Sequence, residues 1–139
     1  SANFSIKYSD DIIVDLWHKW VLITTVAGAT TLFNATIGEI ASTEHGRVFI
    51  TDLHDECVTI AKSEKIKVND DDLAQQRRFL SDKKSTWSSS MRRDMVNKSK
   101  IECAHIFLEL INIADKNNVE CPSLKTVMTN GEIYMRSLV

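Results

Sequence analysis

A lysine lies within the apolar face of a predicted N-terminal helix. Lys19 follows Leu16 by three residues and precedes Ile23, Val26 and Ala27 by four, seven and eight, which are the spacings of one helix face. An ammonium that loses water in such a place gives up its proton more readily, which suits a proton donor. In the more common arrangement the lysine stem is buried and the ammonium stays in water, and this stretch alone favours that alternative.

Two further residues stand out downstream of Lys19. Ser90 precedes Glu102 by twelve residues, within a segment of three consecutive serines and two arginines. On sequence alone Ser90 is equally well explained as the N-cap of a helix. Glu102 fits an ordinary surface carboxylate on the polar edge of its helix. Asp94 is expected to pair on a solvated face with a neighbouring cation, Arg92, Arg93 or Lys98.

Composition limits the classes of function. The 139 residues fit one domain, 43% of them are hydrophobic, and the net charge of −2 lacks the basic excess of nucleic-acid-binding proteins. No secretory signal and no apolar run of roughly 18 residues is visible, so we expect a cytoplasmic protein without a membrane span. Three scattered cysteines suit reduced thiols, and without a CxxC or HExxH motif we expect no metal site. The chain carries neither GxGxxG nor GxxxxGK[ST], hence no dinucleotide or phosphate loop.

The elements that must position these residues are predicted to be helical. Only four glycines and one proline interrupt the chain, and apolar residues recur at helical spacing in most segments. The fold class is therefore all-α, a compact bundle of about six or seven helices in one domain over residues 1–139. The expected helices cover 9–33, 36–42, 46–64, 70–80, 89–97, 99–117 and 122–138, with a Ser-, Lys- and Thr-rich loop over 81–89.

Local signals support several of these boundaries. Ser9 is a plausible N-cap for the first helix, and Asn69 caps a helix whose first turn is acidic. Pro122 suits the first position of the last helix. The β-branched residues over 21–31 leave a strand as a competing interpretation, although the continuous apolar face favours a helix.

Four blocks of the sequence together resemble one known family. They are Leu16–Trp20, Ile37–Ile40, Ser89–Asp94 with Glu102, and Val119–Pro122. In order and spacing they resemble the C-terminal helical domain of ketopantoate reductase (2-dehydropantoate 2-reductase), over about residues 8–138. This resemblance implies the 6-phosphogluconate dehydrogenase C-terminal-like fold.

The resemblance also implies that two domains have different roles. In that family an N-terminal Rossmann domain, absent from this chain, binds NADPH, and the helical domain closes the cleft. Lys19 matches the catalytic lysine that protonates the carbonyl oxygen, and Glu102 matches a glutamate that assists it. Ser90 matches a serine that contacts the substrate carboxylate. These roles agree with the chemistry, because hydride addition builds negative charge on oxygen, which a nearby ammonium stabilises.

The chain departs from the family where substrate is bound. Family members carry asparagines four and eight residues after the lysine and another before the Gly-Glu pair, where this chain has Ile23, Ala27 and Ile37. A polar residue three before the serine is replaced by Trp87. A pocket that loses polar contacts should prefer another substrate, so we expect retained proton transfer and an altered substrate-binding pocket.

Two functions follow as expectations. The first is the C-terminal domain of an NADPH-dependent 2-oxo acid reductase, with ketopantoate and pantothenate biosynthesis as the best single assignment, and another 2-oxo acid or a bulkier ketone next. This fragment alone should be inactive, and its partners should be its own Rossmann domain and a small 2-oxo acid. A homodimer is left open, and neither nucleic acid nor membrane is expected. The alternative is a non-catalytic helical module for dimerisation or apolar-ligand binding.

Overall fold

The computed structural model describes residues 2–139, apart from the side chains of residues 2–10 and of Ala104. This part of the chain forms seven α-helices and one π-helical segment, and it contains no strand. In order they are α1 (Ala2–Phe33), α2 (Ile37–Ala41), α3 (Glu44–Ser63), α4 (Asp70–Leu80), α5 (Ser90–Val96), η1 (Ala104–Leu108), α6 (Glu109–Lys116) and α7 (Pro122–Ser137). The prediction of an all-α bundle of six or seven helices is confirmed.

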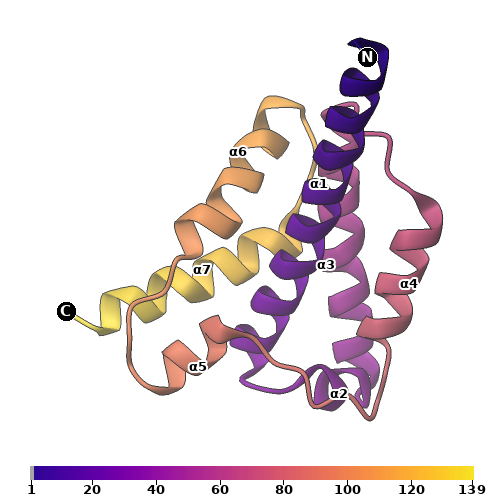
Figure 1. Ribbon diagram of the computed structural model, residues 1–139. Coiled ribbons are helices and arrows are strands. Elements are labelled where there is room, and N and C mark those ends of the chain that lie inside the picture. The colour runs from indigo at the N-terminus through magenta and orange to yellow at the C-terminus, as the bar shows by residue number, and fades with distance from the viewer. Residues whose placement is uncertain (1) are drawn as a thin grey trace.

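Helix α1 is the central element of the bundle. It packs against α3, α7, α5, α2 and α4, and in Figure 1 it runs through the middle of the molecule with α4 on one side and α6 and α7 on the other. Three of its four buried threonines bond within their own helix: Thr25, Thr30 and Thr31 each donate to the carbonyl four residues earlier, at 2.7–2.8 Å. Among the described residues the hydroxyl of the fourth, Thr24, has no hydrogen-bond partner. Because the first three hydroxyls need no other partner, the β-branched stretch over 21–31 can be buried as a helix, as predicted.

The segment Asp11–Phe33 of α1 is long and apolar enough to cross a membrane by length and composition alone. The sequence did not indicate this segment as an unbroken apolar run, because Asp15 and Lys19 interrupt it without removing its overall apolar character. Within the bundle, 44% of this stretch is buried against neighbouring helices. A central helix of a helical bundle has this composition for the same reason as a membrane span, since it faces apolar surroundings.

Most predicted helix ends are confirmed. Thr36 caps α2 in a reciprocal capping box with Glu39, Asn69 caps α4 by accepting from the Asp72 N–H, and Pro122 is the first residue of α7. Two predictions are wrong. Ser9 lies inside α1, which begins at Ala2, and the helix expected over 99–117 instead begins at Cys103 with the π-helical segment η1 before α6.

The core has two parts on either side of α1. The larger one joins α1, α3, η1, α6 and α7 through residues such as Leu53, Phe107 and Leu124. The smaller one joins α1, α2, α3 and α4 through residues such as Ile50. Cys57 and Cys121 are buried in the larger part, and burial raises the pKa of both thiols. They act there as apolar packing groups and not as nucleophiles.

Candidate active site

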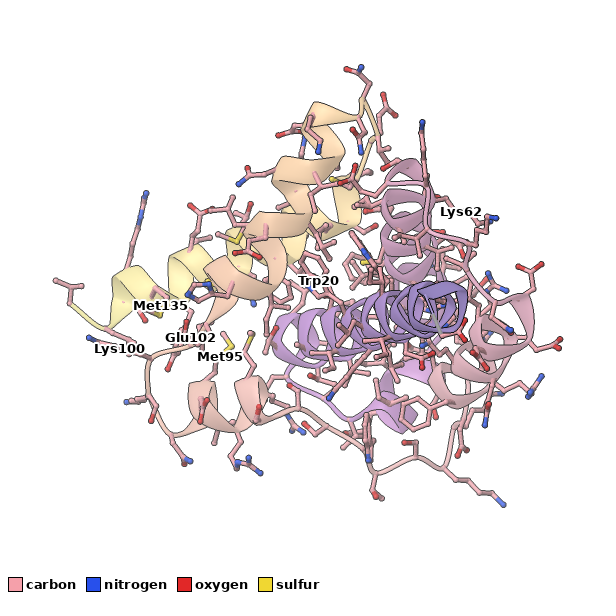
Figure 2. The ribbon with its side chains drawn as sticks, turned by 45° about the horizontal axis from the view of Figure 1, so that its top comes forward. Trp20, Lys62, Met95, Lys100, Glu102 and Met135 are labelled. Atoms are coloured by element: carbon pink, nitrogen blue, oxygen red, sulfur yellow. The ribbon has the colours of Figure 1, made fainter. Side chains whose placement is uncertain are left out.

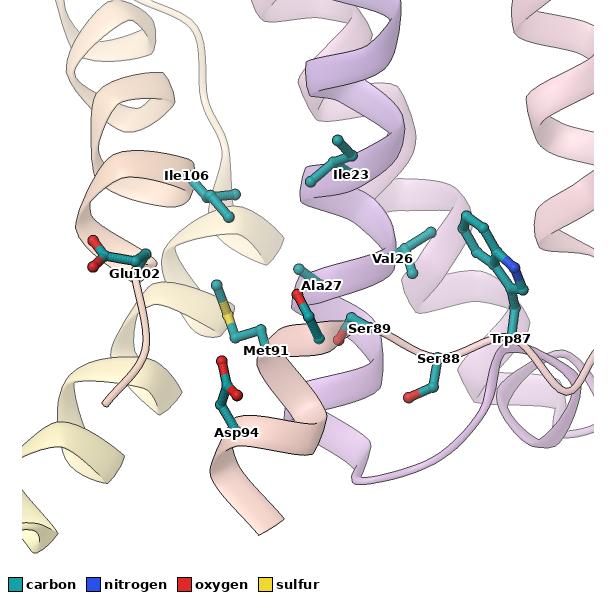
Figure 3. Close-up of a pocket in the computed structure, with 11 residues that line it drawn as sticks. Ile23, Val26, Ala27, Trp87, Ser88, Ser89, Met91, Asp94, Glu102 and Ile106 are labelled. Carbon is teal, nitrogen blue, oxygen red and sulfur yellow. The ribbon is translucent and has the colours of Figure 1, made fainter. Parts of the chain in front are cut away.

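A cavity of about 320 Å³ lies where three separate segments meet. One wall is α1, another is the end of the 81–89 loop with α5, and the third is the segment that leads into η1, as Figure 3 shows. The lining residues are Ile23, Val26, Ala27, Trp87, Ser88, Ser89, Ser90, Met91, Asp94, Glu102 and Ile106. Apolar side chains from α1, α5 and η1 make the surface on which a substrate tail would lie, and serines and carboxylates supply the polar groups.

The loop before α5 is fixed against α2 by backbone contacts. The Ile37 N–H donates to the Trp87 carbonyl at 2.8 Å, and the Gly38 N–H donates to the Ser85 carbonyl at 2.9 Å. A Cβ at Gly38 would lie 2.3 Å from the Ser85 oxygen, so only glycine permits this approach. The glycine of the Ile37–Ile40 block therefore holds the serine-rich loop in place.

Ser89, and not Ser90, is the N-cap of α5. Its hydroxyl accepts from the Arg92 N–H at 3.0 Å and shares a 2.7 Å hydrogen bond with the Thr30 hydroxyl of α1. Ser90 is the first residue of the helix, it is exposed, and it borders the cavity. Among the described residues no hydrogen bond engages the Ser90 hydroxyl, so it is available to a ligand.

Trp20 ties the third wall of the cavity to α1. Its indole Nε1–H donates to the Ile106 carbonyl at 3.2 Å, within η1. In Figure 2 the Trp20 side chain lies between α1 and the orange helices of η1 and α6. A π-helical turn disrupts the usual backbone ladder, and a side-chain donor compensates for this. The contact places Ile106 in the cavity wall.

Lys19 is exposed and lies outside the cavity lining. It precedes Ile23 by four residues on α1, so the two side chains are neighbours about one helical turn apart. The burial considered from the sequence does not occur in this chain, where the ammonium keeps its contact with water. Lys19 therefore lies one helical turn before Ile23, which lines the cavity.

Glu102 lines the cavity, but its carboxylate points away from α1 in Figure 3. Its side chain is 79% exposed, and its carboxylate lies 3.6 Å from the His105 Nε2, which is a cation only when protonated. Asp94 is the residue whose place sequence reasoning missed. It borders the cavity and forms no ion pair among the described residues, contrary to the expected pairing with Arg92, Arg93 or Lys98. Its position four residues after Ser90 on α5 was the available signal.

Of the four positions at which polar residues of the family are replaced in this chain, three line the cavity and one does not. Ile23, Ala27 and Trp87 line the cavity. Trp87 is held edge-on against Phe79, with ring centroids 4.7 Å apart. Ile37 does not reach the cavity, because its side chain is fully buried in the smaller core with Val26.

A cluster of metal-ligand residue types lies elsewhere, between α1 and α4. Oxygen and nitrogen atoms of Asp15, His18 and Asp72 lie within 4.8 Å of one another. The His18 Nε2 accepts from the Asn69 N–H at 3.1 Å, so in neutral His18 the proton is on Nδ1, which faces the Asp72 carboxylate at 3.5 Å. This arrangement leaves no imidazole lone pair for an ion, and the donor set does not fit a metal.

Comparison with known proteins identifies similar chains. A family model described as "Ketopantoate reductase PanE/ApbA C terminal" matches residues 11–130. The uncharacterized oxidoreductase YkpB of Bacillus subtilis (strain 168) is 32% identical over 126 residues, covering 91% of this chain and 42% of that protein. The chain therefore spans less than half the length of this relative.

Two solved structures share the fold. A dimeric ketopantoate reductase from Staphylococcus aureus matches with a TM-score of 0.81 at 18% identity, over 92% of this chain and 45% of that one. A ternary structure of D-mandelate dehydrogenase with NADH and anilino(oxo)acetate matches with a TM-score of 0.79 at 19% identity, over 93% and 54%.

Proposed function

The chain belongs to the family of ketopantoate reductase C-terminal domains, as its resemblance indicated, and from this premise we propose that it is the helical domain of an NADPH-dependent 2-oxo acid reductase. The family is one of oxidoreductases. The observation that carries the proposal is the cavity, where Ser90, Glu102, Ile23, Ala27 and Trp87 gather from three segments, with Lys19 one helical turn away.

The chain's own residues account for proton transfer and substrate placement. Reduced nicotinamide supplies the hydride when bound, and a Rossmann domain outside this chain would hold it, because no glycine-rich phosphate loop occurs here. As the carbonyl oxygen gains negative charge, the Lys19 ammonium stabilises it and donates the proton. The Ser90 hydroxyl binds the carboxylate, and Glu102 is assigned to assist from the third wall of the cavity.

The lining of the cavity bears on the substrate. Ketopantoate, a step in pantothenate biosynthesis, is the first candidate. However, Ile23 and Ala27 of α1 offer no hydrogen bond to the hydroxyl of its tail, and Trp87 of the loop offers only its indole N–H. A 2-oxo acid with an apolar or aromatic tail fits this surface better. The D-mandelate dehydrogenase of the same fold, whose complex holds anilino(oxo)acetate, is a precedent for a bulky ligand.

The test of this proposal is Lys19→Ala in the complete polypeptide that carries this chain. Loss of the proton donor should lower kcat for 2-oxo acid reduction roughly 100- to 10,000-fold. NADPH binding and the free energy of unfolding should change little, because Lys19 is exposed. Lys62→Ala is the matched control, since that lysine projects from α3 away from Trp20 and Glu102 in Figure 2. Full activity of Lys19→Ala would contradict the assigned mechanism.

A second candidate is a non-catalytic module that binds an apolar ligand or a second copy of the chain. The exposed Lys19 and the apolar wall of Ile23, Val26 and Ala27 favour it. It predicts a folded complete polypeptide that reduces no 2-oxo acid. We further propose a cytoplasmic location and, by analogy with the dimeric relative, a homodimer.

A further inference from the structure

Two consecutive hydrogen bonds connect helix α1 to Glu102. The Trp20 indole N–H donates to the Ile106 carbonyl at 3.2 Å, and the Ile106 backbone N–H donates to the Glu102 carbonyl at 3.3 Å. Figure 3 shows Ile106 and Glu102 on the same wall of the cavity, with the Ile106 side chain directed toward α1. Trp20 directly follows Lys19 in the sequence. The helix that carries the proposed proton donor therefore also holds the segment that carries Glu102.

The segment before η1 is held from another side by α7. The Ile101 N–H donates to the Met135 sulfur at 3.4 Å. Cys103 lies so close to Gly131 of α7 that a Cβ added to the glycine would be 3.1 Å from the Cys103 Cβ. Both Ile101 and Cys103 are buried, whereas the Glu102 side chain between them is 79% exposed. The backbone of Glu102 is thus fixed by its buried neighbours, while its side chain lies in water.

The π-helical turn of η1 determines how Glu102 faces the cavity. An α-helix turns by about 100° per residue, and a π-helical turn accommodates about one residue more than an α-helical turn. If η1 became α-helical, Glu102 would therefore rotate by about 100° relative to α6. The Trp20 indole gives the Ile106 carbonyl a partner in the π-helical register. This bond favours the register in which Glu102 borders the cavity.

The Trp20 indole is itself oriented by a neighbouring ring. Trp20 lies against Trp17, with ring centroids 4.9 Å apart and ring planes inclined by 38°, and both side chains pack against the larger core. Both residues are half-buried. The Trp17 indole N–H forms no hydrogen bond within the described part of the chain. The two tryptophans therefore share their packing and differ in the bond to η1.

We propose that Trp20 is a positioning residue for the reduction, whose indole N–H holds η1 in the π-helical register and so fixes where Glu102 meets the cavity. This inference rests on the proposed function and adds to it the contact that places Glu102 relative to the Lys19 turn of α1. Trp20 does not line the cavity and acts through Glu102. Such a contact matters because a misplacement of about 1 Å can cost roughly 100-fold in rate.

The experiment makes Trp20→Phe in the complete polypeptide, which keeps an aromatic ring and removes the indole N–H. Trp17→Phe is the matched control, because it makes the same change on the neighbouring ring. With 3,3-dimethyl-2-oxobutanoate as substrate, Trp20→Phe should lower kcat roughly 10- to 100-fold, and Trp17→Phe less than about 2-fold. Backbone hydrogen exchange, followed by mass spectrometry, should become roughly 10-fold faster in η1 for Trp20→Phe alone.

A second background separates positioning of Glu102 from a purely structural role. Trp20→Phe is repeated in the Glu102→Gln enzyme. If Trp20 acts through Glu102, its substitution should lower kcat less than about 2-fold there, because the group that it positions is already lost. A purely structural role would lower kcat by the same factor in both backgrounds, and that result would overturn the inference.

The remaining outcomes distinguish this inference from the proposed function. If the wild type reduces a 2-oxo acid and Trp20→Phe keeps full kcat, or loses no more than Trp17→Phe, the inference is overturned and the proposed function stands. If the wild type reduces no 2-oxo acid, the proposed function fails, and hydrogen exchange alone decides whether Trp20 holds η1. Unchanged exchange in Trp20→Phe would then overturn the inference as well.

Discussion

His54 shows how one hydrogen bond fixes the chemistry of a buried residue. The Gln76 amide nitrogen donates to the His18 carbonyl at 3.0 Å, so the Gln76 oxygen must accept from the His54 Nε2 at 2.8 Å. The proton of neutral His54 is therefore on Nε2, and its Nδ1 is buried without a partner among the described residues. Burial lowers the pKa of His54, and the hydrogen bond to Gln76 only partly opposes this.

This histidine predicts a pH dependence of stability. A histidine whose pKa is lower in the folded state binds fewer protons there than in the unfolded chain. Its stabilising contribution is complete above the unfolded pKa of about 6.5 and is lost as the pH falls from there towards the folded pKa. The urea concentration at the unfolding midpoint should decrease as the pH is lowered from about 7.5 to about 5.5. In His54→Gln the midpoint should depend less on pH over this range. An unchanged pH profile in His54→Gln would exclude His54 as the cause.

At the residue scale, the sequence indicated which residues gather at the site better than it indicated which of them are buried or exposed. Ser90, Glu102, Ile23, Ala27 and Trp87 were predicted together and line one cavity. The burial of Ile37 could not be predicted, whereas an ammonium of Lys19 in contact with water is the arrangement that its helical stretch favoured. A helical pattern says which residues share a face, but it does not say which neighbour covers that face.

At the scale of elements, α7 depends on a carboxylate from another helix. Cys121 precedes Pro122 without a side-chain cap, and the first free N–H groups of α7, on Ser123 and Leu124, instead donate to the Glu56 carboxylate of α3 at 3.1 and 2.9 Å. Two charge-assisted hydrogen bonds at a helix N-terminus hold α3 and α7 together. No sequence pattern indicated this cap, because the partners lie 67 and 68 residues apart.

Glu56→Ala should therefore lower the free energy of unfolding by about 2 kcal/mol, since a lost N-cap and unsatisfied amides both contribute. Chemical denaturation with matched slopes measures the change. Asp52→Ala, an exposed position on the same helix, is the control and should fall within about 0.5 kcal/mol of the wild type. Equal effects of the two substitutions would show that Glu56 does not cap α7.

Gly38 carries the contact between α2 and the serine-rich loop. Gly38→Ala should cost about 1–3 kcal/mol of stability, because the added methyl group meets the Ser85 backbone and the loop must move. The shift should alter the fluorescence of Trp87 and weaken substrate binding. Gly28→Ala is the contrasting variant, since its methyl group would meet only side-chain atoms, 3.1–3.2 Å away on Leu53 and Val127. A Gly38→Ala protein as stable as the wild type would contradict the close approach.

The sequence predicted the regular α-helices well but did not predict the π-helical segment η1. Acidic first turns, caps and apolar spacing are local signals, and they predicted α2, α4, α5 and α7 within one or two residues. The π-helical turn η1 was not predictable, because its Ile106 carbonyl is satisfied by Trp20, 86 residues away. That long-range contact exists only once α1 and η1 have packed.

At the scale of the whole molecule, three segments of the helical bundle meet at the candidate active-site cavity. Helix α1 provides the apolar wall, with Lys19 one helical turn before it, the loop and α5 provide the serines and Asp94, and the segment before η1 provides Glu102. The cofactor would come from a domain outside this chain, which spans 42% of its relative YkpB. In the proposed reductase, catalysis would belong to the complete polypeptide, and this chain would supply Lys19, Ser90 and the apolar lining of the cavity.

The most direct measurement is NADPH oxidation by that complete polypeptide with ketopantoate and a panel of 2-oxo acids of increasing apolar and aromatic bulk. We expect turnover of at least one free 2-oxo acid, with bulkier apolar tails preferred over ketopantoate. A folded protein that binds NADPH and reduces no member of the panel would contradict the assignment as a 2-oxo acid reductase.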